Sequence, residues 1–98
     1  MTSKQRAYLK SIAMVTDPVL NIGKDGIEGS MTDAVLEAID KRELVKLSVL
    51  KNCMEDPIEL ARILSERTHS EVVQVIGRRI VLYKPAKKKE DRKIVLPK

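Results

Sequence analysis

The sequence predicts an α+β domain in which three helices pack with a four-stranded mixed sheet. Two observations carry this prediction. Apolar residues recur at the spacing of amphipathic helices in three segments, and four short runs rich in branched apolar residues lie between and after them. The element order is therefore α-β-α-β-α-β-β. The patterned sequence is long enough for one domain with one modest core.

The first helix is expected to begin at Thr2 or Ser3 and to end near Met14, because its apolar residues fall on one face. Residues 18–22, PVLNI, have the leading proline and the branched apolar side chains of a short strand.

The second helix is indicated by Ile27, Met31, Val35 and Ile39, which recur every four residues and form a core-facing stripe. We expect this helix to end near residues 41–42.

Where the second helix begins is left open by Gly29, because glycine inside a helix costs up to about 1 kcal/mol relative to alanine. The helix begins either directly after the preceding loop or late, with Ser30 as its cap and Asp33 three residues on.

The remaining elements follow from alternation and from a helix-start signal. Residues 44–50 alternate as a strand, and Asp56 followed by a proline predicts a capped helix that ends near Thr68. Residues 71–76 and 79–83 are expected to form two strands joined by a short turn.

The loop Gly23-Lys24-Asp25-Gly26 is the first candidate site. Two glycines let a backbone approach closely, and Lys24 adds a positive charge. A helix start beside such a loop would offer unpaired N–H groups to phosphate. Gly-x-x-Gly loops clamp single-stranded RNA by this logic in the KH module. The pattern alone fits a plain turn as well as an RNA clamp.

Positive charge is concentrated at the C-terminal end. Residues 1–83 hold twelve basic and twelve acidic residues, whereas residues 84–98 hold seven basic and two acidic residues, which is the whole net charge of +5. We predict a domain over residues 1–84 and a basic, flexible tail over residues 85–98. Such a segment either follows a phosphate polymer or serves only solubility. Its candidate RNA contacts are Lys84, Lys87, Lys88 and Lys89.

Five further basic residues are candidate RNA contacts. Lys4, Arg6 and Lys10 lie on the first predicted helix, where the alternative is an ordinary solvated face. Arg78 and Arg79 lie at the turn before the last strand, and the alternative for Arg78 is pairing with an acidic residue.

Composition argues against an enzyme. Cys53 is the only cysteine and His69 the only histidine, so we expect neither a disulfide nor a metal site, and no cofactor or small-molecule substrate. The only aromatic residues are Tyr8 and Tyr83, so bases cannot be stacked on a sheet of aromatic rings. No signal peptide or membrane-spanning run is evident, and we expect a monomer in the cytoplasm.

Five blocks in register resemble one known family: QRAYLK at 5–10, IGKDG at 22–26, ELVK at 43–46, ELA at 59–61 and QVIGRRIVLY at 74–83. Together they resemble the CRM domain (chloroplast RNA splicing and ribosome maturation), in its stand-alone bacterial YhbY-like form. The likeness covers residues 2–85. It implies a fold like the C-terminal domain of bacterial translation initiation factor three, RNA binding, and association with precursors of the large ribosomal subunit.

The resemblance assigns the family's RNA-binding loop to Gly23, Lys24 and Gly26. Asp25 stands where the family often has glycine or a basic residue. Because a carboxylate repels phosphates, the loop either binds more weakly or turns Asp25 away.

The leading hypothesis is a non-catalytic RNA-binding protein that assists assembly of the large ribosomal subunit. The alternative is a protein-interaction module on a ribosomal or assembly protein, with the basic tail as a non-specific anchor for polyanions. The zero net charge of residues 1–83 favours the alternative.

Overall fold

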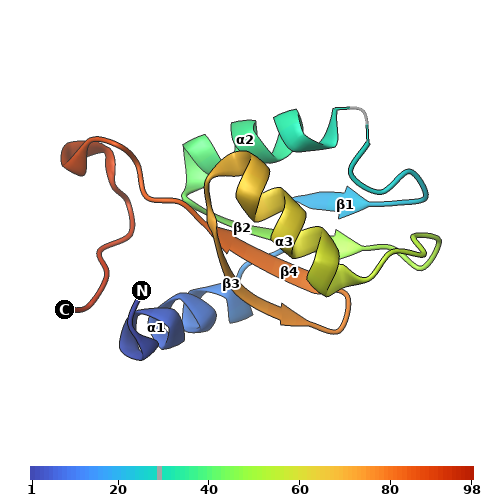
Figure 1. Ribbon diagram of the computed structural model, residues 1–98. Coiled ribbons are helices and arrows are strands. Elements are labelled where there is room, and N and C mark those ends of the chain that lie inside the picture. Colours follow the sequence, from blue (N-terminus) through green and yellow to red (C-terminus); the bar gives the residue numbers. More distant parts are fainter. Residues whose placement is uncertain (29) are drawn as a thin grey trace.

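The computed structural model describes residues 1–28 and 30–98. It confirms the α+β class and the predicted element order, followed by a short 3₁₀ turn near the C-terminus (Figure 1). The elements are α1 (Ser3–Met14), β1 (Leu20–Ile22), α2 (Met31–Arg42), β2 (Leu44–Val49), α3 (Pro57–Thr68), β3 (Glu71–Ile76), β4 (Arg79–Tyr83) and η1 (Lys89–Asp91).

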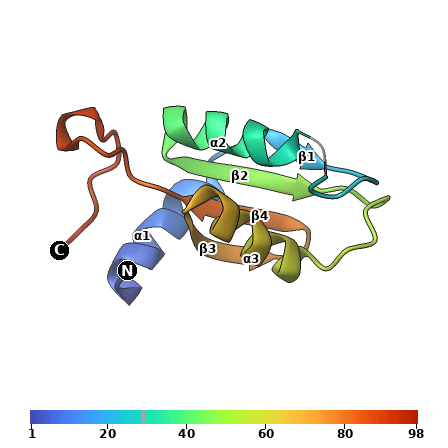
Figure 2. The same ribbon diagram turned by 45° about the horizontal axis from the view of Figure 1, so that its top comes forward.

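The four strands form one mixed sheet in the order β1-β2-β4-β3. β1 pairs with β2 in parallel, while β4 is antiparallel to both of its neighbours. Helices α2 and α3 cover one face of this sheet, and α1 lies on the opposite face (Figures 1 and 2). The order places the carboxyl ends of β1 and β2 and the β3–β4 turn at the same end of the sheet.

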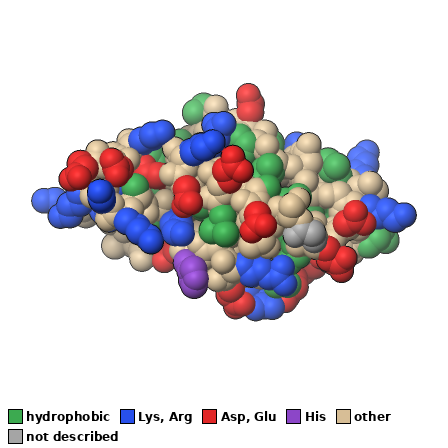
Figure 3. Space-filling view, turned by 90° about the horizontal axis from the view of Figure 1, so that it is seen from above, with side chains coloured by type: hydrophobic (Ala, Val, Ile, Leu, Met, Phe, Trp, Pro, Cys, Tyr) green, Lys and Arg blue, Asp and Glu red, His purple; other side chains and the backbone are tan. Residues whose placement is uncertain are grey.

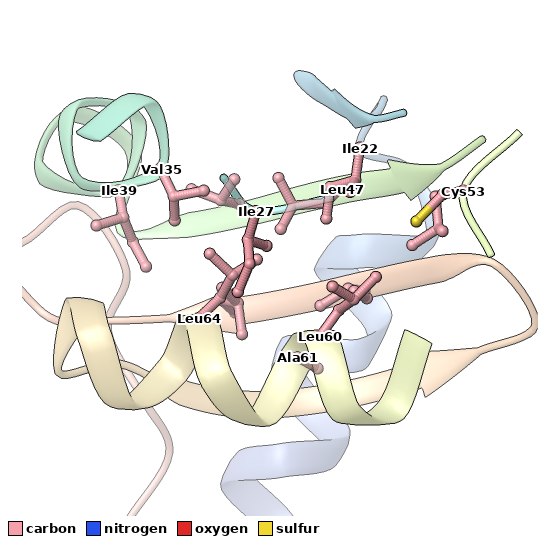
Figure 4. Close-up of a cluster of buried hydrophobic side chains, with 13 residues drawn as sticks. Ile22, Ile27, Val35, Ile39, Leu47, Cys53, Leu60, Ala61 and Leu64 are labelled. Carbon is pink, nitrogen blue, oxygen red and sulfur yellow. The ribbon is translucent and has the colours of Figure 1, made fainter. Parts of the chain in front are cut away.

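The main core lies between the sheet and the pair α2 and α3 (Figure 4). Val35 and Ile39 of α2 and Leu60 and Leu64 of α3 are fully buried there against Leu47 of β2. The four-residue stripe predicted for the second helix is therefore core.

A second, smaller core lies beneath α1. Leu9 and Ala13 of α1 pack against buried residues of β2, β3 and β4. Ile94 and Leu96 of the C-terminal segment, partly buried, pack against this same cluster.

The helix starts follow the capping signals of the sequence. Thr2 caps α1, with its hydroxyl accepting from the Gln5 amide at 3.1 Å and the Gln5 side chain accepting in return from the Thr2 amide at 3.0 Å. Asp56 caps α3 by accepting from the Ile58 amide at 3.1 Å.

The second helix has the later of its two expected starts. α2 begins at Met31, with Ser30 as N-cap but without a side-chain capping hydrogen bond. Ile27 precedes the helix in a turn and still reaches the core. Gly29, which left the start open, lies outside the described residues.

The C-terminal segment is held at Glu43, between α2 and β2. The Glu43 carboxylate is buried and accepts from the backbone N–H groups of Ala86 (2.9 Å), Lys93 and Ile94 (3.0 Å). Burial raises the pKa of this carboxyl. The three N–H donors and the charge of Arg92 together lower it by more than burial raises it, so the pKa lies below its ordinary value. The segment predicted as a basic, flexible tail thus makes specific contacts with the domain.

We predict that Glu43→Gln lowers the free energy of unfolding at pH 7 by about 1–3 kcal/mol, because the charged acceptor of three backbone N–H groups is lost. Folding lowers the pKa of the Glu43 carboxyl, so its ionised form stabilises the folded state fully when the pH is above the ordinary pKa of 4.5. This stabilisation is lost as the pH falls through the lower pKa of the folded state. Urea unfolding at pH 7 and pH 3 should therefore show a difference between the wild type and the variant that shrinks at pH 3.

Glu90→Gln, at an exposed position of the same segment, is the matched control and should leave stability unchanged at both pH values. An equal loss for Glu43→Gln at pH 7 and pH 3 would contradict a role for the carboxylate charge.

Candidate nucleic-acid interface

The Gly23–Gly26 loop is a tight turn that leaves Lys24 and Asp25 exposed. The Gly26 amide donates to the Gly23 carbonyl at 3.0 Å, and Gly26 has a φ of +63°. A Cβ added at Gly26 would lie 2.9 Å from a carboxylate oxygen of Glu55. The left-handed backbone therefore favours glycine here, and a larger residue would also push the end of the flexible Glu55 side chain aside.

Two backbone donors at the tip of this loop are unused. The N–H groups of Lys24 and Asp25 make no hydrogen bond to any described residue. α2 begins only at Met31, so its N-terminus does not adjoin Gly26. The expectation that a helix start directly beside the loop offers its N–H groups to phosphate is therefore wrong. The loop offers an anion its own two N–H groups and the Lys24 ammonium.

The loop has neighbours that the chain brings from other strands. A Cβ at Gly23 would lie in ordinary contact with Asn52 and Leu50, which follow β2. The Arg78 guanidinium donates to the Leu50 carbonyl at 2.9 Å, which ties the β3–β4 turn to the same region. Lys51 lies between these contacts and is exposed, and sequence reasoning did not select it.

Acidic residues at this end offset the basic ones. Exposed Asp25 follows Lys24 directly, exposed Glu28 comes four residues after Lys24, and Glu55 lies against Gly26. From the side of α2, acidic and basic side chains are interspersed, and no broad surface of one sign is visible (Figure 3). On this face, attraction to a phosphate chain must therefore come from local donors and not from a wide positive field.

The predicted basic residues divide into three groups. Lys24, Arg78 and Arg79 lie at the loop end of the sheet. The lysines of the C-terminal segment lie at the other end of the molecule, whose longest dimension is 39 Å (Figure 1). There Lys84, Lys87 and Lys88 border a cleft of about 630 Å³, and Lys89 begins η1 beside it.

The third group lies on α1 and includes a residue with a structural role. Arg6 donates to the carbonyls of Val72 and Val73 at 2.6 and 2.8 Å, where β3 has an irregular register. Its guanidinium also lies 4.0 Å from the Glu71 carboxylate. Lys4 and Lys10 are exposed.

The single cysteine and the single histidine of the chain both have structural positions. Cys53 is buried in the main core, and His69 caps the C-terminus of α3 with a φ of 55°. Over residues 1–28 and 30–98, no group of three His, Cys, Asp or Glu residues is arranged to hold a metal ion. The helices in this part of the chain are all too short or too polar to cross a membrane.

Comparison with known proteins gives consistent matches over the whole chain. The model of the CRS1 / YhbY (CRM) domain matches residues 1–84. The "Probable RNA-binding protein YqeI" of Bacillus subtilis is 42% identical over 97 residues, which is 99% of each chain. A protein of Haemophilus influenzae named "RNA-binding protein" is 30% identical over 98 residues. The match covers 100% of this chain and 96% of that protein.

A solved structure matches equally well. The solution structure of the hypothetical protein SAV1595 from Staphylococcus aureus is 45% identical, superposes with a TM-score of 0.81 and covers 99% of both chains.

We predict that Gly26→Ala destabilises the protein by about 1–2 kcal/mol because its backbone is left-handed, with a smaller further loss because the flexible Glu55 side chain must move aside for the new Cβ. Gly77→Ala is the matched control, since Gly77 also has a positive φ of 55° but no atom within 4 Å of its Cβ position. Urea unfolding of both variants should give the larger loss for Gly26→Ala.

The additional loss should disappear when Gly26→Ala is combined with Glu55→Ala. Equal losses for the two single glycine variants would contradict the close packing of the loop against Glu55.

Proposed function

This chain belongs to the CRS1 / YhbY (CRM) domain family, and from that premise we propose that it binds RNA and catalyses no reaction. Relatives that match nearly the whole chain carry the name RNA-binding protein. The observation that carries the proposal is the loop tip, where an exposed Lys24 lies beside two backbone donors that form no hydrogen bond with any described residue. These groups suit a phosphate of the RNA backbone, because N–H donors and an ammonium together stabilise an oxyanion.

The remaining basic residues would extend this contact. Arg78 and Arg79 lie beside the loop and would neutralise neighbouring phosphates of the same strand. The lysines of the C-terminal segment lie too far away to join that contact and would meet another part of the RNA. Lys4 and Lys10 are exposed on α1 and can add to either contact, whereas the donors of Arg6 are already engaged by β3.

For the RNA itself we propose ribosomal RNA of the large-subunit precursor. This assignment rests on the family to which the chain belongs. A small non-catalytic protein with two separated groups of phosphate contacts is suited to holding an RNA segment until the subunit has matured.

A protein-interaction module is the second candidate. Exposed apolar side chains gather near the loop end, with Leu50 and Met54 after β2 and Ile58 in the first turn of α3. Residues 1–83 carry no net charge. Both features suit a protein partner better than a phosphate chain.

We predict that affinity for single-stranded RNA falls with salt, with a slope in log–log form of about −0.7 for each phosphate neutralised. Lys24→Gln should lower affinity and reduce the slope by about 0.7. Replacing Lys87, Lys88 and Lys89 together by Gln should reduce the slope by up to about 2. The measurement is fluorescence anisotropy of a labelled oligonucleotide at several salt concentrations.

Arg67→Gln is the control, because Arg67 is an exposed cation of α3 outside every predicted contact, and it should change neither quantity. If Lys24→Gln leaves the affinity unchanged, the loop is not the clamp. If the wild type binds no RNA at all, the protein-interaction reading replaces this one.

We further predict that the protein co-sediments with large-subunit precursors in a sucrose gradient of a bacterial extract. Mature ribosomes should carry little of it, because the proposed binding ends when the subunit matures. Sedimentation only in the free-protein fractions, with RNA binding intact in vitro, would overturn the choice of ribosomal RNA but not RNA binding.

A further inference from the structure

A row of four side chains crosses the sheet immediately beside the loop. Asn21 of β1 pairs with Ser48 of β2, Ser48 pairs with Arg79 of β4, and Arg79 pairs with Ile76 of β3. Residues opposite one another in neighbouring strands point to the same face, so these four side chains form one line across all four strands. With strands about 4.8 Å apart, the line is about 14 Å long. We call it the cross-strand row.

The cross-strand row lies on the face that carries α1 but beyond the end of that helix. Ser48 and Arg79 alternate with Leu47 and Ile80, which belong to the main core on the opposite face. The last turn of α1 is anchored one row earlier, where the Lys46 ammonium donates to the Ala13 carbonyl at 3.0 Å.

No described element covers the row. Asn21 and Arg79 are exposed, and Ile76 keeps 64% of its surface open although it is a large apolar residue on a strand. Only Ser48, between its neighbours, is nearly covered, at 7%.

The polar members of the row have unused hydrogen-bonding capacity. Within the part of the chain that the structure describes, the side chains of Asn21, Ser48 and Arg79 form no hydrogen bond and no ion pair. Arg78, the adjacent residue, differs in this respect because its guanidinium donates to the Leu50 carbonyl. The amide of Asn21 and the guanidinium of Arg79 are thus exposed and without a partner among the described residues, with the nearly covered Ser48 hydroxyl between them.

Starting from the proposed function, we propose that the cross-strand row contacts the unpaired bases of the RNA strand whose backbone the Gly23–Gly26 loop holds. Asn21 is followed directly by Ile22 and the loop, so a strand gripped at Lys24 can continue over the row. The exposed asparagine amide of Asn21 donates to and accepts from base edges. A guanidinium plane stacks on a base, and Ile76 adds an apolar contact beside it.

The row supplies what the aromatic content of the chain does not. Tyr83 is buried and Tyr8 lies on α1, so no aromatic ring stands on the open part of this sheet face. Arg79 is the planar group that remains there for stacking.

The test compares two RNA oligonucleotides of about eight residues, one with bases and one abasic with the same ribose-phosphate chain. The wild type should bind the oligonucleotide with bases at least about tenfold more tightly, because the abasic chain offers nothing to stack on Arg79 or to bond with Asn21. Arg79→Lys combined with Asn21→Ala should reduce this ratio to about two. Affinity for the abasic chain should stay within about twofold, because Arg79→Lys keeps the charge.

Arg67→Lys, the same exchange on α3, is the control and should keep the wild-type ratio. Equal affinity of the wild type for both oligonucleotides, or an equal loss on both in the double variant, would overturn the role of the row while leaving RNA binding in place. Failure of the wild type to bind either oligonucleotide would overturn the proposed function together with this inference.

Discussion

The pairing of β2 on both of its edges is the constraint on which the rest of the molecule depends. β2 bonds to β1 in parallel and to β4 in antiparallel, and five of its six residues are buried. The parallel pairing places the end of β1 beside the end of β2, so that the glycine loop meets the segment that follows β2. The antiparallel pairing brings the β3–β4 turn to the same end.

The same strand separates the two basic regions. Its carboxyl end leads to the loop region, and its amino end follows Glu43, which receives the N–H groups of the C-terminal segment. If RNA contacts both basic regions, β2 is the rigid element that connects the two contacts. Because the strand is buried, this separation is fixed by the core and does not depend on surface charge.

The helices and strands could be predicted from the sequence because each is encoded locally, by periodicity and by caps such as Thr2 and Asp56. The cross-strand row could not, since Asn21 and Ser48 become neighbours only through strand register, and the row stays uncovered only because α1 ends at Met14. Glu43 is a similar case. Its three partners lie more than forty residues away in the chain, and no local pattern links them.

The contact of Arg6 with β3 has a consequence for behaviour at high protein concentration. β3 is an outer strand of the sheet, and an outer strand presents free carbonyl and N–H groups to which a strand of another molecule can add. Arg6 occupies the carbonyls of Val72 and Val73, and the irregular register there distorts the edge. The opposite edge, β1, is only three residues long. Both borders thus resist edge-to-edge aggregation, which favours a folded chain that stays dispersed in a crowded solution.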